Sequence, residues 1–387
     1  YFDYIVVDEA HHAASDSYVN IMEYFNPKFT LGMTATPERG DSLSVFDLFD
    51  NNAALEVRLY EALEDDLVIP FHYFGITDID GVDLQGVNLD DISEVASRLM
   101  INRRVDFIID KMNFYGYDGK FRKLLGFCVS IEHAQYMADE FTKIGIKSVV
   151  LSGRDSVATR KKYIAKLQSD KDDLQAIFTV DIFNEGVDIP DLDMVMFLRP
   201  TESPTVFLQQ LGRGLRISKD KEYVNVLDFI GNYMNNFMIP IALSGDRTYN
   251  KDTIRKYVRE GSRVIPGEST IHFDEISKKR IFESIDSSKT TKSFLKEKYF
   301  ALKYKLGRVP NILDFYEYGE IDPMLFIQYS RSYDQFVKTV DKDFNIMFGD
   351  REEAILEFIS SLVNGKRVHE LLMLKCILNN EKMSSDT

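Results

Sequence analysis

The chain has 387 residues, a formal net charge of −15 and two cysteines. Its hydrophobic content of 44% and charged content of 28% are typical of a globular chain with a sizeable core, and its length predicts about two or three domains. No apolar run reaches the roughly 18 residues of a membrane-spanning helix, so we expect no membrane partner. The two cysteines show neither a disulfide framework nor a zinc-ligand spacing, and a reducing cytoplasm is the expected location.

Charge is unevenly distributed along the chain. Residues 1–100 hold 20 acidic and four basic residues, whereas residues 246–310 hold nine acidic and 16 basic residues. The overall negative charge argues against indiscriminate nucleic-acid binding, but the local excess of cations permits a basic face. Arg255 and Lys256 in this segment are candidate contacts to a phosphate backbone, with a merely solvated helix face as the alternative.

The chain begins with an apolar run, Tyr4 to Val7, that breaks off into Asp8 and Glu9. This pattern predicts a strand over 3–8 with two carboxylates at its carboxyl end, where ligands bind in open α/β sheets. An Asp at this position can hold Mg²⁺ together with phosphate oxygens, and a Glu beside it can orient the water that attacks a γ-phosphate. A strand that simply ends in solvated acids is the alternative.

A hydroxyl-rich turn follows the next predicted strand. Helical spacing predicts a helix over 15–25, and a second buried strand is predicted over 29–33, which runs into the turn at 34–37. Taken alone, this turn is typical of a polar connection in which Thr36 helps to cap a helix. Because it comes shortly after the acidic stretch, it also fits a hydroxyl relay between two sites.

Strands and helices alternate from residue 92 to about residue 233, which predicts a parallel, doubly wound sheet. After residue 245 the strand signals fade and helices are predicted. The predicted strands cover 124–129, 147–151, 174–179, 194–198 and 223–227, and the predicted helices cover 131–144, 156–168, 203–215, 251–260, 274–287, 291–305, 323–340 and 351–378.

These elements predict a partial first domain over 1–77, a linker over 78–91, a complete second domain over 92–245 and a mainly α-helical C-terminal domain over 246–387. The linker is rich in Asp, Gly and Asn and poor in bulky side chains. Several aromatic residues of the C-terminal domain are expected to lie in its core rather than to stack on bases: Tyr299, Phe300, Tyr304, Phe315 and Tyr316.

The segment from Gln209 to Arg216 carries two arginines, Arg213 and Arg216, and two glycines, Gly212 and Gly214. Arginines three residues apart share one face if they lie on a helix. Two guanidinium groups on one face can neutralise phosphate oxygens where the charge of a transition state develops. A solvated basic helix end is the alternative.

A loop predicted over 180–190 follows a buried strand and contains Gly186 and a second acidic residue, Asp188. The loop suits contact with a nucleotide ribose or with an arginine, and Thr179 before it could donate to a nucleic-acid phosphate. The alternative is an ordinary turn that Pro190 ends.

Four segments, 8–11, 34–37, 184–190 and 209–216, stand in the order and spacing of the motifs of superfamily 2 helicases and translocases. The chain resembles the DEAD/DEAH-box motors of restriction and repair enzymes from residue 1 to about residue 232. The resemblance implies RecA-like parallel, doubly wound α/β sheets, one partial and one complete, with ATP and Mg²⁺ between the two domains.

The resemblance also implies roles for individual residues. By this resemblance, Asp8 coordinates Mg²⁺ and Glu9 positions the attacking water. The other implied roles are nucleotide contact for Gly186 and Asp188, nucleotide contact and coupling for His11, coupling to the nucleic-acid site for Thr34 and Thr36, completion of the catalytic site for Gln209, Arg213 and Arg216, and contact with the nucleic-acid backbone for Ser130, Ser152, Gly153 and Thr179.

The chain departs from the family in one respect. The phosphate-cradling loop Gly-x-x-x-x-Gly-Lys-[Ser/Thr] is absent, and residues 116–120 do not replace it. We therefore expect a missing partner, the N-terminal half of the first RecA-like domain, with an attached nuclease domain as one option. This chain alone is expected not to hydrolyse ATP. Residues 264–274 and 306–315 resemble the uncharacterised region that follows the motor in some bacterial helicase–nucleases.

The expected function is the motor portion of an ATP-dependent DNA helicase or translocase in restriction, defence or repair, with DNA favoured over RNA. Two alternatives stay open, a non-catalytic module that binds nucleic acid or protein, and an RNA helicase. ATPase activity of the longer parent, stimulated by DNA more than by RNA, would separate them.

Overall fold

The chain forms two compact units, and each is described by itself. The first unit comprises Tyr1–Leu55, Arg247–Asn250 and Lys289–Thr387, and the second comprises Glu56–Asp246 and Lys251–Ser288. The computed structural model describes residues 2–10, 13, 15–34, 45–84, 86–119, 121–180, 189–200, 203–219, 221–230, 237–246, 248–261, 265–288, 290–318, 321–342, 344 and 348–362.

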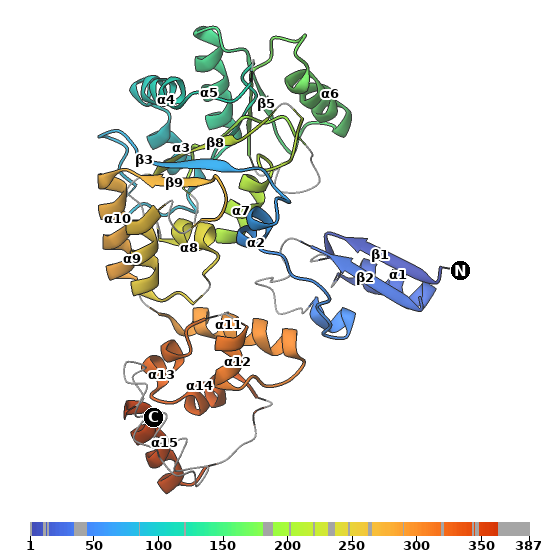
Figure 1. Cartoon of the computed structure of the whole chain (residues 1–387), viewed down its shortest axis with the longest axis vertical. Helices are drawn as coiled ribbons and strands as arrows, with labels where there is room; N and C mark the ends of the chain where they lie inside the picture. The colour runs from blue at the N-terminus through green and yellow to red at the C-terminus, as the bar shows by residue number, and fades with distance from the viewer. Residues whose placement is uncertain are drawn as a thin grey trace. The chain divides into compact units, whose positions relative to one another are not determined.

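The second unit is built on a parallel sheet of seven strands in the order β5-β6-β4-β7-β8-β3-β9, as far as its residues are described. Figure 1 shows α4 and α5 on one side of β3 and β9, and α8, α9 and α10 on the other. The strands are β3 (Phe71–Thr77), β4 (Leu124–Phe127), β5 (Ser148–Leu151), β6 (Ala176–Thr179), β7 (Met194–Phe197), β8 (Val224–Ile230) and β9 (Thr270–Phe273). The helices are α2 (Leu59–Glu64), α3 (Ile92–Leu99), α4 (Asn102–Tyr115), α5 (Ile131–Lys143), α6 (Val157–Gln168), α7 (Pro204–Gly212), α8 (Met238–Ser244), α9 (Lys251–Glu260) and α10 (Glu275–Ser287).

The central strands are mostly apolar because helices cover both faces of a parallel sheet. Every residue of β4, β6 and β7 is buried. The helices that follow strands begin at serine caps: the hydroxyls of Ser130, Ser156 and Ser203 accept backbone N–H groups of α5, α6 and α7. These local signals explain why the predicted helices and strands of this region lie close to the observed ones.

Two strands of this sheet come from outside the segment in which the second domain was expected. β3 was expected in the first domain and β9 in a helical one, but β3 pairs with both β8 and β9. At this end, Thr77 donates from its backbone N–H and its hydroxyl to the two carboxylate oxygens of Asp274, each at 2.6 Å. The pairing of β3 with β9 joins two segments that lie far apart in the chain, so it leaves no local signal in the sequence.

The first unit contains a parallel pair, β1 (Tyr4–Asp8) and β2 (Phe29–Met33), joined by α1 (Asp16–Phe25). A short 3₁₀ helix, η2 (Phe46–Phe49), packs on one face of the pair, and Val7 is buried there. Gly32 on β2 allows this approach, because a Cβ atom at Gly32 would lie 2.6 Å from the Phe49 ring. The opposite face carries large exposed side chains: Tyr4, Val6, Phe29, Leu31 and Met33.

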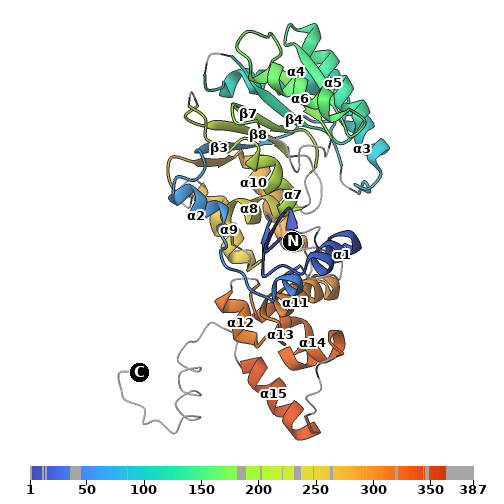
Figure 2. The same ribbon diagram turned by 90° about the vertical axis from the view of Figure 1, so that its right-hand side faces the viewer.

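The rest of the first unit is helical, as expected, and Figure 2 shows α11 to α14 grouped together. Tyr299 and Phe315 lie in the aromatic core, whereas Tyr316, also expected there, is 78% exposed. The helix predicted over 323–340 is two helices, because Arg331 has a φ of +62° and Ser332 caps a new helix. The helices are α11 (Lys292–Leu306), α12 (Ile312–Glu317), α13 (Met324–Ser330), α14 (Tyr333–Val340) and α15 (Asp350–Leu362).

No helix within the described ranges is both long and apolar enough to cross a bilayer. The helix predicted over 351–378 is seen as α15 up to Leu362, and its remaining residues lie outside the described part of the chain.

A buried ion pair connects three elements of the second unit. The Arg104 guanidinium on α4 donates through Nε to Asp78 Oδ2 at 2.8 Å, and both side chains are only 1% exposed. Arg104 Nη2 also donates to the backbone oxygen of Leu198, which follows β7, at 3.2 Å. Because Asp78 directly follows β3 and Leu198 directly follows β7, the pair joins the carboxyl end of β3, next to the edge of the sheet, to that of the central strand β7.

We expect Arg104→Met to lower the free energy of unfolding of the second unit by about 3–5 kcal/mol, because it leaves the Asp78 carboxylate buried and unpaired. Adding Asp78→Leu should recover much of that loss. Arg98→Met is the matched control, since the Arg98–Glu94 pair is about 40% exposed, and should cost no more than about 0.5 kcal/mol. Urea unfolding followed by circular dichroism measures all three. Equal losses for Arg104→Met and Arg98→Met would show that the buried pair is dispensable.

Candidate functional site

The carboxyl edge of the β1–β2 pair gathers two residues that the sequence assigns to the nucleotide site, Asp8 and Glu9, and one that it assigns to coupling, Thr34. Asp8 pairs with Met33 in register, so Glu9 and Thr34 are the next residues on neighbouring strands. Neighbouring strands lie roughly 4.8 Å apart, which places these side chains within reach of one ligand. Asp8 is exposed, and Glu9 and Thr34 are half-buried. His11 and Thr36 lie outside the described residues.

The backbone at Glu9 is strained. Its φ is +50°, in the left-handed region that non-glycine residues rarely occupy. The Glu9 N–H donates to Asp8 Oδ1 at 3.0 Å, which holds the Asp8 carboxylate against the backbone at Glu9. Left-handed non-glycine residues cost of order 1–3 kcal/mol and gather at functional sites. This feature supports a functional role for the strand end and has no signature in the sequence.

The chemistry of Asp8 suits a magnesium ligand. Mg²⁺ is usually bound through one or two carboxylates together with substrate phosphates and water rather than by an all-protein cage. The exposed Asp8 carboxylate at the end of a parallel strand is a donor of this kind. Among the described residues there is no group of three or more His, Cys, Asp or Glu side chains able to hold a metal ion.

The carboxyl edge of the sheet in the second unit brings together the candidate nucleic-acid contacts. Thr179, the last residue of β6, pairs with Leu151 on β5 and with Phe127 on β4. The residues that follow these neighbouring strands therefore share one edge. The contacts gathered there are Ser130, Ser152, Gly153 and Thr179.

These candidate contacts differ in accessibility. The Thr179 side chain is 0% exposed and Ser152 is 5% exposed. The Ser152 hydroxyl donates to Asp155 Oδ2 at 3.1 Å, and the Ser130 hydroxyl accepts the backbone N–H of His133 at 3.0 Å. Both hydroxyls thus stabilise local turns. Ser130, which is half-buried, and Gly153, which is exposed, are the accessible members.

The arginine segment forms a turn rather than a continuous helix. α7 ends at Gly212, Arg213 is its C-cap residue, and Arg216 lies beyond the helix. The expectation that both arginines share a helix face is therefore wrong. Arg216 is exposed, whereas Arg213 and Gln209 are half-buried. Residues 181–188, which include the candidate nucleotide contacts Gly186 and Asp188, lie outside the described part of the chain.

Gly214 lets the turn after α7 lie directly against the sheet. A Cβ atom at Gly214 would lie 2.8 Å from Val195 Cγ2 and 3.1 Å from Val224 Cγ2, so the turn packs directly on β7 and β8. A Cβ atom at Gly212 would meet nothing within 4 Å. The sequence offers no local reason for the second glycine, and the structure supplies one through tertiary packing.

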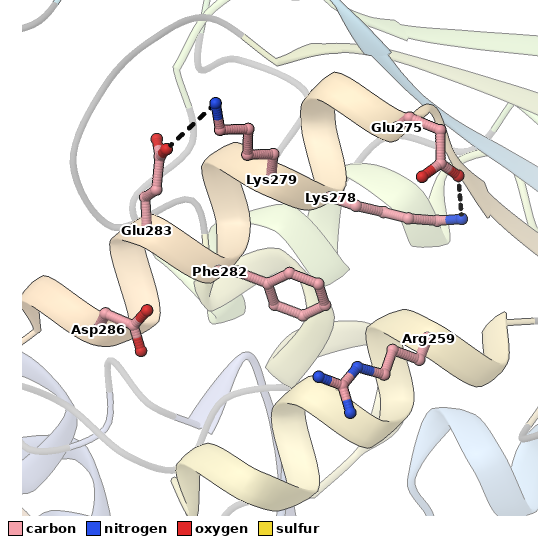
Figure 3. A pocket seen from close by; sticks show the side chains of 7 residues that line it. All are labelled: Arg259, Glu275, Lys278, Lys279, Phe282, Glu283 and Asp286. Carbon is pink, nitrogen blue, oxygen red and sulfur yellow. Dashed lines mark hydrogen bonds and ion pairs between the residues drawn. The ribbon is translucent and has the colours of Figure 1, made fainter.

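A shallow pocket between α9 and α10 shows how the basic segment is arranged (Figure 3). Its volume is about 440 Å³, and the guanidinium of Arg259 lies over the Phe282 ring, 5.6 Å from its centroid. Lys278 pairs with Glu275 at 2.8 Å. The lining residues are Arg259, Glu275, Lys278, Lys279, Phe282, Glu283 and Asp286.

The two candidate phosphate contacts on α9, Arg255 and Lys256, differ in whether nearby carboxylates already pair with them. Arg255 pairs with Asp252 at 2.9 Å and with Asp286. These carboxylates raise the pKa of Arg255, chiefly through the hydrogen bond to Asp286. The neighbouring Lys256 side chain is exposed. Nearby acids therefore neutralise part of the basic excess that the sequence shows, and Lys256 is the better placed of the two for a phosphate.

Three family models match the chain. Residues 1–39 match the type III restriction enzyme res subunit, residues 107–218 match the helicase conserved C-terminal domain, and residues 295–387 match a domain of unknown function (DUF8090). The first two matches cover the Asp8–Glu9 strand end and the arginine turn.

Proteins similar to this chain are named as helicases and as restriction enzyme subunits. A Saccharomyces cerevisiae protein, by name an ATP-dependent helicase, is 26% identical over 235 residues, which cover 59% of this chain and 34% of that protein. A type I restriction enzyme EcoAI endonuclease subunit of Escherichia coli is 26% identical over 264 residues, which cover 59% of this chain and 32% of that protein. A solved fragment from Vibrio vulnificus YJ016, described as an HsdR subunit of a type I restriction enzyme, is 25% identical and covers 59% of this chain and 43% of that chain, with a TM-score of 0.47.

The family models and the curated relatives confirm the resemblance to superfamily 2 helicases and to the motors of restriction enzymes. The parallel sheet with helices on both faces confirms the expected RecA-like α/β fold. The chain spans about a third of the length of the two curated relatives named above.

We expect Gly214→Ala to destabilise the second unit by about 1–3 kcal/mol, because the added methyl group overpacks the contact with β7 and β8. Gly212→Ala is the matched control. Alanine meets no neighbour there, and it should leave stability unchanged or raise it by about 0.4–1 kcal/mol. Urea unfolding measures both variants, and equal stability of the two would contradict the packing role of Gly214.

Proposed function

We propose that the chain is the motor portion of an ATP-dependent superfamily 2 DNA helicase or translocase that acts in restriction, defence or repair. The observation that carries the proposal is the register of β1 and β2, which places Asp8, Glu9 and Thr34 on one edge. The strained conformation of Glu9 supports it. The similarity to an ATP-dependent helicase and to a type I restriction enzyme subunit supports the assignment to restriction and to DNA.

In this proposal, ATP supplies the phosphoryl group that is transferred to water. The residues of the chain hold the metal ion, orient the water and stabilise the charge of the transition state. Asp8 holds the metal ion, and Glu9 orients the attacking water and accepts its proton. Arg213 and Arg216 supply the positive charge that the transition state requires, with Gln209 beside them. The roles of the remaining candidates, both nucleotide contacts and coupling residues, are proposed on the resemblance alone: His11, Thr36, Gly186 and Asp188.

We further propose a partner for the bare face of β1 and β2. Parallel strands are normally covered on both faces, yet Tyr4 is 73% and Val6 is 58% exposed. An N-terminal half of the first RecA-like domain, with the phosphate-cradling loop, would cover this face. In this view the 387-residue chain by itself hydrolyses ATP far more slowly than roughly 1 per second, the low end of typical enzymes.

In the longer polypeptide that contains these residues, we expect Glu9→Gln to reduce ATP turnover roughly 100- to 10,000-fold while ATP binding is kept, because the amide cannot accept the proton of the water. Steady-state ATPase assays and nucleotide titrations measure the two effects. Glu23→Gln on α1, an exposed position, is the matched control.

The same assay tests the class of protein and its substrate. Turnover of the unmodified polypeptide should rise with duplex DNA more than with RNA. Stimulation by RNA alone would favour an RNA helicase. Nucleic-acid binding without any turnover would favour a non-catalytic module, and it would overturn the proposed function.

We expect Lys256→Ala to weaken DNA binding and to reduce the slope of log affinity against log salt by about 1, as for the loss of one phosphate contact. Arg255→Ala should change the slope less, because Asp252 and Asp286 already pair with this guanidinium. Fluorescence anisotropy at several salt concentrations measures both. If neither slope changes, the basic face of α9 is only solvated.

A further inference from the structure

Lys221 connects two segments that the sequence motifs single out separately. It lies just before β8, at the amino edge of the sheet in the second unit. Its Nζ donates to the backbone oxygen of Pro190 at 2.7 Å and to the backbone oxygen of Gly214 at 2.8 Å. Pro190 ends the motif over 184–190, and Gly214 lies in the turn that carries the arginines.

The surroundings of Lys221 hold its ammonium in place. Burial lowers the pKa of Lys221 to about 8, against the opposing charges of Asp191, Asp193 and Asp118. An ammonium has three donors and no acceptor, so two carbonyl oxygens and the nearby carboxylates suit it. Asp191 is itself fixed, because the Ser218 hydroxyl donates to its Oδ1 at 2.5 Å.

Placing this cation below the surface is costly unless its hydrogen bonds are satisfied. Lys219, two residues earlier, is exposed to solvent, so the segment does not by itself require a lysine to be buried. Lys221 instead spends two of its three donors on backbone oxygens from two different segments. Neither oxygen belongs to a helix or a strand that would fix it, so the ammonium holds the two together, alongside the Ser218–Asp191 hydrogen bond between the same segments.

We propose that Lys221 is a positioning residue that ties the segment ending at Pro190 to the Gly214 turn and so sets the placement of Arg213 and Arg216. The inference rests on the proposed function, because it assigns Lys221 an effect on ATP turnover through those arginines. Its two hydrogen-bond partners are backbone oxygens of the chain, so its effect on turnover would run through the arginine turn.

The test compares variants of the longer polypeptide. Lys221→Met should lower kcat roughly ten- to a hundredfold, as small misplacements of catalytic groups do, with little change in the KM for ATP. Lys221→Arg should restore part of the loss, because a guanidinium can also donate to two carbonyl oxygens. Lys219→Met is the matched control and should leave turnover unchanged.

A double-mutant cycle separates positioning from a merely structural role. If Lys221 acts through the arginine turn, Lys221→Met should have little further effect on kcat in a background that carries both Arg213→Ala and Arg216→Ala. A fall by the same factor in both backgrounds would overturn the inference, as would a kcat within about twofold of the unmodified protein. An unmodified polypeptide without any ATPase activity would instead overturn the proposed function.

A second measurement does not depend on ATP turnover. In the 387-residue chain, amide hydrogen exchange at residues 212–216 should accelerate in Lys221→Met, or in Lys221→Gln if the methionine variant does not fold. It should not accelerate in Lys219→Met. Unchanged exchange in every Lys221 variant would show that the two hydrogen bonds do not hold the turn, and it would overturn the inference even if the polypeptide is an active ATPase.

Discussion

Every strand pair in the described part of the chain is parallel. Parallel strands cannot be joined by a tight hairpin, so each connection crosses over and every carboxyl end falls on the same edge of its sheet. This constraint places Thr34 beside Glu9 in the first unit. In the second unit it gathers Ser130, Ser152 and Thr179. In both units the candidate chemistry follows from which residues happen to end a strand.

The same constraint requires cover on both faces of each sheet, and the two units meet it differently. Every residue of β4, β6 and β7 is buried, so the middle of the sheet in the second unit is covered on both faces. In the first unit Val7 is 6% exposed, whereas its neighbour Val6 is 58% exposed. Alternation of this kind is ordinary for an antiparallel sheet with a wet face. In a parallel pair with large apolar side chains on the exposed face, this alternation is the observation behind our proposal that another segment covers that face.

Sequence reasoning succeeded where the signals are local. Apolar runs marked the central strands, and helical spacing marked the helices between them. The strands predicted over 3–8 and 29–33 also lie close to β1 and β2. Sequence reasoning failed where tertiary packing decides: the pairing of β3 with β9, and the end of α7 at Gly212. The left-handed conformation of Glu9 and the burial of Thr179 also require coordinates, because neither leaves a pattern in the sequence.

The basic residues show most clearly why the function of a residue cannot be predicted from composition alone. Residues 246–310 have a large excess of cations, but Arg255 is already bound by two carboxylates, which leaves little of its charge for a phosphate. Lys221 lies outside that segment and attracts no notice in the sequence. Its ammonium donates to two backbone oxygens from different segments, so it holds those segments in place instead of binding a ligand. The function of a cation thus depends on its partners, and a count of basic residues cannot identify which one binds a ligand and which one holds the site together.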